Sequence, residues 1–392
     1  MSEYQYYEFL AIDSPLDAKQ MATLRALSTR AEITSTRFTN VYHWGDFKGS
    51  PEKLMEQYFD AHVYVANWGT QILMLRLPKA GLSKETLVPY CVDEGLHGWT
   101  KGEHLIIEWR REGEPSDEWV DGEGWMARLT PIREELERGD YRALYLGWLY
   151  AVSFDDPDEV REEIIEPPVP AGLGALTAAQ RSLVEFLGVD EDFLAAAAQA
   201  SPPVSDRTES PHEMSQWVAA IPEDEARQYL LLLLQGKAKQ AEREVKQKYV
   251  TAQRASVSPA TAKSGQKRRS LAELHTLVER ARADRLERKK QQKQRELEKQ
   301  RKQRERYLAT LAEDFARHWR QLDDLVAQQA ASAYDRARDL LVDLSEAYTL
   351  KHEHDEFLKK LAQFRATHTR RSALIRRLDK VGLKQPPALD SF

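Results

Sequence analysis

The sequence predicts an α+β head domain with a mixed or antiparallel sheet. Mostly α-helical regions follow, including a long charged helix and a small α-helical C-terminal domain. Three observations support this fold class. Short runs rich in β-branched and aromatic residues are concentrated in the first third of the chain. Apolar residues at three-and-four spacing dominate the remainder. Residues 271–327 contain neither glycine nor proline, which is typical of one long helix.

The head, residues 1–128, is predicted from alternating strand and helix signals. Strands are expected at residues 3–12, 31–42, 61–69, 71–78 and 104–110. Helices are expected at 15–27, with Ser14 as the N-cap and Pro15 in the first turn, and at 51–59, after Ser50. A sheet covered by helices fits this order, and a ferredoxin-like topology is one arrangement compatible with it.

Residues 129–250 are predicted to form a helical extension. Helices are expected at 130–139, 140–152, 178–187 and 191–200. Thr177 and Gln180 form a capping box before the third of these, and Asp190 caps the fourth. Proline-rich loops are expected at 166–174 and 201–213.

The longest aliphatic run of the chain is Leu230–Leu234, in a helix that starts near Pro222. Such a run is expected to lie in the core. Five residues are far fewer than the roughly 20 that a membrane span needs, so no membrane association is predicted. The chain has one cysteine, Cys91, and its start lacks a secretory signal, which together indicate the cytoplasm.

The C-terminal part divides into three predicted segments. Residues 251–270 are small, polar and basic, which predicts a flexible linker. Residues 271–327 form the long basic helix, and residues 328–392 form an α-helical tail. Within the tail, amphipathic helices are expected at 332–348, 354–368 and 372–383.

Charge is distributed very unevenly along the chain. Residues 1–235 carry 20 Lys and Arg against 41 Asp and Glu, whereas residues 236–306 carry 23 against 9. The head and its extension are therefore acidic, and the segment after them is strongly basic. Such a partition indicates that different parts of the molecule meet different partners.

The long helix does not read as a sustained coiled coil. Leu271, Leu274, Val278 and Ala281 begin a heptad seam, but the next position at seven-residue spacing is Arg285. Eleven-residue spacing aligns Leu286, Leu297 and Leu308, which is too thin an apolar stripe to hold a partner helix. Three alternatives remain: a solvated rigid arm, a phosphate-binding surface, and an arm that docks on the acidic head.

The partner or phosphate-binding hypothesis rests on residues 263–306. Residues 282–306 alone hold 12 Lys and Arg against 5 Asp and Glu, with no aromatic residue before Tyr307 to stack on bases. The predicted binding residues are Lys267, Arg268, Arg269, Arg282, Arg285, Arg288, Lys289, Lys290, Lys293, Arg295, Lys299, Arg301 and Lys302. Nucleic-acid binding through them would be non-specific and directed at backbone phosphates.

Catalytic signatures are weak throughout the sequence. It contains no Walker A motif, no HExxH and no GxSxG, and one cysteine cannot form a zinc finger. No metal or cofactor is therefore predicted. The nearest approach to a catalytic cluster is His43 and Asp46 in residues 42–49, with His97 near another turn. An enzyme would need these three side chains to converge in one pocket.

Three stretches, residues 3–49, 166–187 and 305–344, together resemble a family of uncharacterised bacterial proteins with no assigned function. The resemblance covers most of the chain and implies a bacterial cytoplasmic protein, but no catalytic residue. From the charge partition, the uninterrupted helix and the absence of a catalytic signature, we expect a non-enzymatic interaction or scaffold protein with a protein partner. The alternative is a nucleic-acid-associated accessory protein that binds backbone phosphates through residues 263–306.

Overall fold

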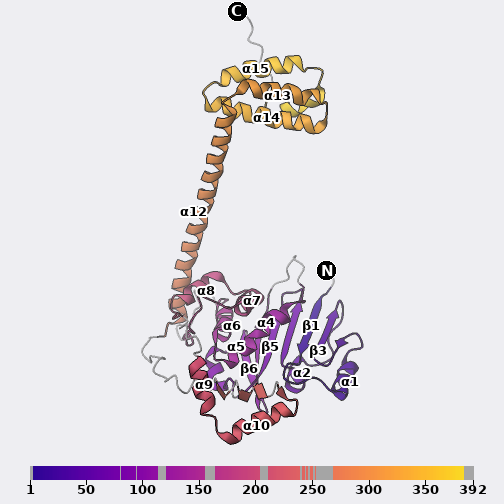
Figure 1. Cartoon of the computed structure of the whole chain (residues 1–392), viewed down its shortest axis with the longest axis vertical. Helices are drawn as coiled ribbons and strands as arrows, with labels where there is room; N and C mark the ends of the chain where they lie inside the picture. The colour runs from indigo at the N-terminus through magenta and orange to yellow at the C-terminus, as the bar shows by residue number, and fades with distance from the viewer. Residues whose placement is uncertain are drawn as a thin grey trace, which may run out of the picture. The chain divides into compact units, whose positions relative to one another are not determined.

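A computed structural model of the chain describes residues 3–79, 81–93, 95–113, 121–154, 164–203, 211–238, 241–242, 244–245, 248–249, 252 and 268–383. The chain forms two compact units, Met1–Arg285 and Leu286–Phe392. Helix α12 (Leu271–Leu311) begins in the first unit and ends in the second (Figure 1). The α+β head and the mostly helical remainder are as the sequence predicts.

The first unit is built on one seven-stranded sheet in the order β2-β3-β1-β4-β5-β7-β6. Its strands are β1 (Gln5–Leu10), β2 (Glu32–Ile33), β3 (Arg37–Tyr42), β4 (Ala61–Ala66), β5 (Gln71–Pro78), β6 (Leu96–Lys101) and β7 (His104–Arg111). All neighbouring strands pair antiparallel. The sheet contains two split β-α-β units, β3-α2-β4 around β1 and β5-α3-β6 around β7, as a ferredoxin-like topology does, but its order of seven strands is not that of a four-stranded ferredoxin-like sheet.

The described helices of the first unit include those that cover the two faces of the sheet. They are α1 (Ala18–Leu27), α2 (Pro51–Gln57), α3 (Lys84–Leu87), the 3₁₀ helix η1 (Val88–Tyr90), α4 (Trp125–Leu129), α5 (Pro131–Glu137), α6 (Arg142–Val152), α7 (Ala178–Leu187), α8 (Glu191–Ala198), α9 (Pro211–Ala219) and α10 (Glu223–Leu234). Residues 251–270, the predicted linker, lie outside the described residues except for 252 and 268–270.

The larger core lies between one face of the sheet and helices α4 to α8. Trp109 of β7 is fully buried there and donates a hydrogen bond from Nε1 to the Ala143 carbonyl oxygen at 2.9 Å. A Cβ atom at Gly147 would lie 2.7 Å from the Trp109 ring, so glycine permits the close contact between α6 and the sheet. The head and its helical extension therefore share one core, which the boundary predicted at residue 128 does not divide.

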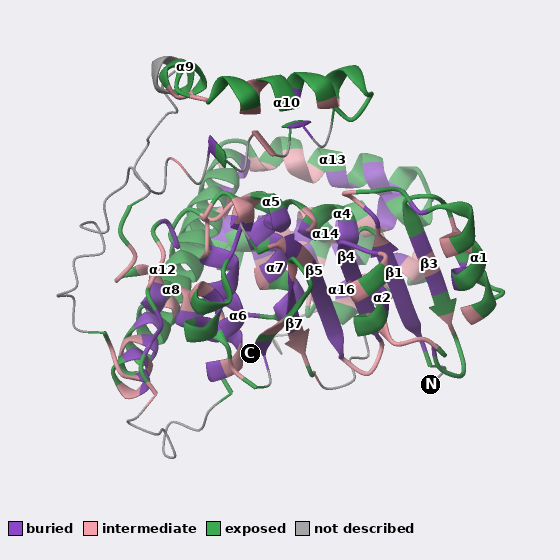
Figure 2. Cartoon of the chain, turned by 90° about the horizontal axis from the view of Figure 1, so that it is seen from below, coloured by how far each residue is buried: buried purple, intermediate pink, exposed green. Residues whose placement is uncertain are grey.

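A second core covers the opposite face of the sheet beneath α1, α2 and the loop after β3. It is rich in aromatic rings, with Phe9, Phe38 and Phe59 all fully buried. All six residues of β4 are buried, because both faces of that strand are covered (Figure 2). Continuous burial of a central strand explains why its sequence shows no polar alternation.

Helices α9 and α10 contribute no residue to either of these cores. The prediction that Leu230–Leu234 lies in the core is wrong. Four of its five leucines are exposed, with only Leu232 partly covered, and α9 and α10 are drawn largely as exposed helices in Figure 2. The neighbouring Tyr229 is the buried residue of α10.

The second unit contains the end of α12 and a small helical bundle. Its helices are α13 (Phe315–Ala327), α14 (Ala331–Leu350), α15 (His354–Thr367) and α16 (Ser372–Lys380), close to the predicted tail helices. The predicted helix 271–327 is divided after Leu311, because Asp314 caps α13 by accepting a hydrogen bond from the Arg317 backbone N–H. Phe315 then stacks on Tyr348, with ring centroids 3.7 Å apart.

Candidate functional site on helix α12

The first three turns of α12 belong to the core of the first unit. Leu271, Leu274 and Val278 are buried with the side chains of α6, α7 and α8, and Ala281 is also buried. These are the residues that begin the heptad seam in the sequence. Their partner is the head itself rather than a second helix of a coiled coil.

A short backbone pairing fixes the start of this helix. Residues 164–166 form an isolated antiparallel bridge with 269–271: the Glu166 N–H donates to the Arg269 carbonyl at 3.0 Å, and the Leu271 N–H donates to the Ile164 carbonyl at 2.9 Å. The bridge places Glu166 and Arg269 side by side beneath α6.

Glu166 is buried and forms the centre of a three-residue contact at this bridge. Arg269 donates to its two carboxylate oxygens, each at 2.6 Å, and the Tyr145 hydroxyl donates to Oε1 at 2.5 Å. Burial, reinforced by the charge of Glu166, raises the pKa of Tyr145 far above its ordinary value. Arg269, one of the predicted binding residues, is therefore part of the fold.

A second buried carboxylate binds the helix about three to four turns further on. Asp192 of α8 is 1% exposed and accepts hydrogen bonds from Arg285 Nε at 2.8 Å and Nη2 at 2.7 Å. Arg282 Nε lies 3.4 Å from the same carboxylate. The hydrogen bond from Arg285 holds the pKa of Asp192 below its ordinary value. Arg282 and Arg285 thus dock the start of the basic helix on the acidic head, which is one of the three alternatives that the sequence leaves open.

Beyond Arg285 the helix is exposed to solvent over residues 286–306. All residues of this segment except Arg304 are exposed, including Leu286 and Leu297 at 56% each. The segment holds ten Lys and Arg against four Glu. Basic side chains here are therefore available for contacts outside the fold, depending on which side of the helix they occupy.

Five cations share one side of this exposed segment. We call this set the basic stripe: Arg288, Arg295, Lys299, Lys302 and Arg306. Their spacing of seven, four, three and four residues places them along one line of an α-helix, over about 27 Å. Four of them line one surface hollow together with Glu298 and Gln303.

A second set of four cations occupies the other side of the helix, near Leu286 and Leu297. We call this the opposite set: Lys289, Lys290, Lys293 and Arg301. Lys302 of the stripe pairs with Glu298 at 2.8 Å, and Arg301 of the opposite set pairs with Glu305 at 3.4 Å, both at i,i+4 spacing. Such exposed pairs contribute only about 0.3–0.5 kcal/mol.

The last turns of α12 pack on the second unit. Arg304 binds Asp343 at 2.5 Å and Glu346 at 2.9 Å, both on α14, and these contacts raise its pKa. The Tyr307 hydroxyl also donates to Asp343, at 2.9 Å. Leu308 and Leu311 are buried against Ala347. The exposed segment is thus bounded at each end by a buried contact.

The structure sorts the thirteen predicted binding residues into distinct groups. Lys267 lies outside the described residues, and Arg268 is exposed just before the helix. Arg269, Arg282 and Arg285 are bound to buried carboxylates. The other eight lie in the exposed segment, four in the basic stripe and four in the opposite set. Sequence reasoning missed Arg306, whose position at i+4 from Lys302 could have indicated it.

The catalytic candidates do not converge. His43 and Asp46 follow β3, and both are exposed; Asp46 accepts a hydrogen bond from Gln5. His97 lies on β6, with Nε2 3.8 Å from the buried Glu108 carboxylate. Five strand spacings separate β3 from β6 in the sheet, or roughly 24 Å. His97 therefore cannot share a pocket with the other two.

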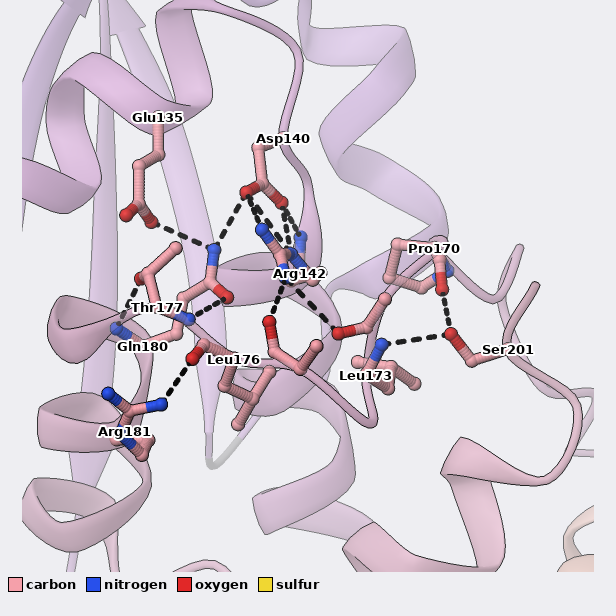
Figure 3. Close-up of polar contacts among 12 residues, drawn as sticks. Glu135, Asp140, Arg142, Pro170, Leu173, Leu176, Thr177, Gln180, Arg181 and Ser201 are labelled. Atoms are coloured by element: carbon pink, nitrogen blue, oxygen red, sulfur yellow. Dashed lines mark hydrogen bonds and ion pairs between the residues drawn. The ribbon is translucent and has the colours of Figure 1, made fainter. Parts of the chain in front are cut away.

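The most connected buried polar cluster lies around Arg142 (Figure 3). Arg142 donates to both oxygens of Asp140 and to the carbonyls of Gly172 and Ala175, and Gln180 donates to Asp140. Burial alone would raise the pKa of Asp140, but the hydrogen bonds and charge of Arg142 outweigh it and leave that pKa lowered. The cluster holds the proline-rich loop after residue 166 in place. Its bonds are internal, so it is a structural feature.

Comparisons with known proteins give neither a family nor a function for this chain. No protein family model matches the sequence, and neither curated proteins nor solved structures give a significant match. Among the described residues, no three His, Cys, Asp or Glu side chains are placed to hold a metal ion. No helix in the described part of the chain is long and apolar enough to cross a membrane.

Proposed function

We propose that this chain is a non-enzymatic interaction or scaffold protein of a bacterial cytoplasmic complex. Its basic helical arm links the acidic head to the helical tail and binds an acidic surface of a protein partner. The observation that supports this proposal best is the basic stripe. Its cations project from an exposed helix segment of about 21 residues, whereas the neighbouring Arg282, Arg285 and Arg304 are used by the fold.

The charge pattern of the stripe favours a protein surface as its partner. Glu298 lies in the same hollow as Arg295 and Lys299, so the surface is basic but mixed in sign. Patterned charge of this kind gives specificity for a complementary pattern, whereas a uniform row of phosphates would be repelled by the glutamate. The absence of aromatic residues between 286 and 306 also removes base stacking.

A pair of matched variants tests the proposal. The first carries R295Q, K299Q, K302Q and R306Q in the basic stripe, and the second carries K289Q, K290Q, K293Q and R301Q in the opposite set. Both remove four positive charges from the same exposed helix, and each breaks one i,i+4 ion pair. Glutamine has nearly the same helix propensity as lysine and arginine, so α12 remains intact in both.

The measurement is affinity capture with the full chain from a nuclease-treated lysate of its source organism. We expect at least one protein that the wild type and the opposite-set variant retain and that the stripe variant loses by tenfold or more. Equal loss in both variants would mean that only total charge matters. Retention by all three chains would exclude the stripe as the binding surface.

The second candidate function is non-specific binding to nucleic-acid phosphates, which the net positive charge of the exposed segment favours. Five stripe cations on duplex DNA predict a slope near −4.5 for log affinity against log salt, since each neutralised phosphate contributes about −0.9. Fluorescence anisotropy with a labelled 20-base-pair duplex measures this slope. Capture that disappears on nuclease treatment, together with this slope, would favour the second function over the first.

A further inference from the structure

The outer side of α10 carries an apolar surface that is exposed in the described part of the chain. Leu230, Leu231, Leu233 and Leu234 are exposed by 59%, 54%, 49% and 85%. Val218 of the preceding helix α9 is also 54% exposed. Single exposed leucines are normal in soluble proteins, but four in one helix form a contiguous patch of the kind that marks an interaction site. Figure 2 shows α10 as an exposed helix along most of its length.

The inner side of the same helix is already occupied. Tyr229 is buried, and Glu225 forms an ion pair with Lys248 at 2.5 Å. Trp217 of α9 meets Tyr249 edge-to-face, with ring centroids 5.0 Å apart. Because these contacts fix the orientation of α10, its leucines point outward as a consequence of its own packing.

The outward residues form a regular stripe along α10. Glu223, Arg227, Leu230, Leu231 and Leu234 follow the spacing of one helix face, with the charged residues toward the N-terminal end. Arg227 is bound to Glu223 at 2.6 Å, so its charge is balanced within the helix. The leucines are left as the dominant feature of the face.

We propose that this leucine face pairs with the same face of a second copy of the chain, as two antiparallel α10 helices about a two-fold axis. The axis would pass between Leu230 and Leu231. Leu230 of one copy then packs against Leu231 of the other, and Leu234 of one copy packs near Arg227 of the other. This two-fold arrangement uses one patch twice and closes on itself, as isologous dimers do. It goes beyond the proposed function, because it does not depend on what binds the basic stripe.

Charge complementarity at the two ends of α10 selects a second copy in this orientation. The first turn carries Glu223, Asp224 and Glu225, whereas Lys237 lies just beyond the C-terminal end and is exposed. About the same axis, Asp224 of one copy faces Lys237 of the other, and this occurs twice. Antiparallel helix dipoles add to the attraction. A parallel pair would instead bring the two acidic ends together.

The helix is short, which bounds the strength of the dimer. Twelve residues span about 18 Å, so the contact is well below the roughly 1,600 Å² of a standard stable interface. We therefore expect a reversible dimer that dissociates in the micromolar range. Sedimentation velocity on the full chain from about 1 to 200 µM should show the mass rising from 45.1 kDa toward twice that value.

Two variants with a matched control locate the contact. L231E/L234E should raise the dissociation constant at least 100-fold and leave a monomer across the range. The control, L286E/L297E, changes two leucines of comparable exposure on α12 and should leave the dimer unchanged. Because all four leucines are exposed, circular dichroism melting should be the same in both variants.

A charge exchange tests the orientation. D224K alone and K237D alone should each weaken the dimer about tenfold, and D224K/K237D should restore it, because the two charges only change places across the two-fold axis. A chain that stays monomeric at 200 µM would overturn the proposal. So would a dimer that is insensitive to L231E/L234E, one that L286E/L297E disrupts equally, or a double charge variant without restoration.

Discussion

The anchoring of α12 in the head core can be tested by removing one leucine. Leu274 is fully buried in the larger core, three residues after the helix begins. Leu274→Ala removes its buried methyl groups and leaves a cavity, for which large-to-small substitutions typically cost 2–5 kcal/mol. We expect the free energy of unfolding of the first unit to fall by about 3 kcal/mol. Leu297→Ala is the control, since that leucine is on the same helix but 56% exposed.

Urea denaturation followed by tryptophan fluorescence measures this loss. Seven of the nine tryptophans lie within residues 1–150, so the signal reports on the first unit. With a urea dependence of about 3 kcal/mol per molar, a loss of about 3 kcal/mol lowers the midpoint by about 1 M. Leu297→Ala should change the free energy of unfolding by no more than about 0.5 kcal/mol, as exposed substitutions generally do.

If Leu274→Ala and Leu297→Ala lower the urea midpoint equally, the anchoring of α12 in the head core is refuted. Equal midpoints would mean that the first turns of α12 are not part of the head core. Arg282 and Arg285 would then no longer be held beside Asp192, and both would join the cations available to a partner. The proposal that residues 286–306 bind a partner therefore depends on this measurement.

Two further predictions concern buried polar groups of the first unit. Burial lowers the pKa of His62 to about 4, below its value near 6.5 in the unfolded chain, so the unfolded state binds the proton first. The free energy of unfolding of the first unit should therefore fall by about 3 kcal/mol as the pH drops from 6.5 to 4. In urea titrations, His62→Leu should abolish that part of the pH dependence. Tyr145→Phe removes the hydroxyl that donates to Glu166 and should lower the free energy of unfolding of the first unit by about 2 kcal/mol. Tyr307→Phe changes an exposed tyrosine of the second unit and should leave the urea midpoint of the first unit unchanged.

Local signals in the sequence were sufficient for many of the helix starts. Thr177 and Gln180 form the predicted capping box, and Ser50 caps α2 with Pro51 in its first turn. The first helix begins later than predicted, because Asp17 and Gln20 form a capping box that takes precedence over Ser14. Capping depends on residues within one turn, which is why it can be read from sequence.

Elements that depend on distant partners could not be predicted in the same way. The sequence does not predict strand β6, because Leu96–Lys101 contains Gly98 and lacks a regular alternation. A Cβ atom at Gly98 would lie 2.7 Å from the Ile106 carbonyl, so the glycine serves the close pairing with β7. Hydrophobicity alone predicts that Leu230–Leu234 lies in the core, but it does not reveal whether another element covers these leucines.

The proposed binding surface shows the same division between local and distant information. The sequence locates the basic region, and the periodicity of a helix could have located the stripe. It could not show that Arg269, Arg282 and Arg285 are bound to the fold, because their carboxylates lie 90 or more residues away on α8 or 103 residues away at Glu166. A count of positive charges therefore overestimates the surface open to a partner.

The two buried carboxylates also explain why so basic a helix can begin inside an acidic unit. Glu166 and Asp192 are buried, which is costly for a carboxylate unless it is paired, whereas Arg269, Arg282 and Arg285 keep part of their surface in solvent. Arg269 and Arg285 supply that pairing through two-point hydrogen bonds, the strongest geometry available to arginine. Lysine cannot form such a fork, so the cations that bind these two carboxylates are arginines. Every lysine of residues 286–306 lies at the surface.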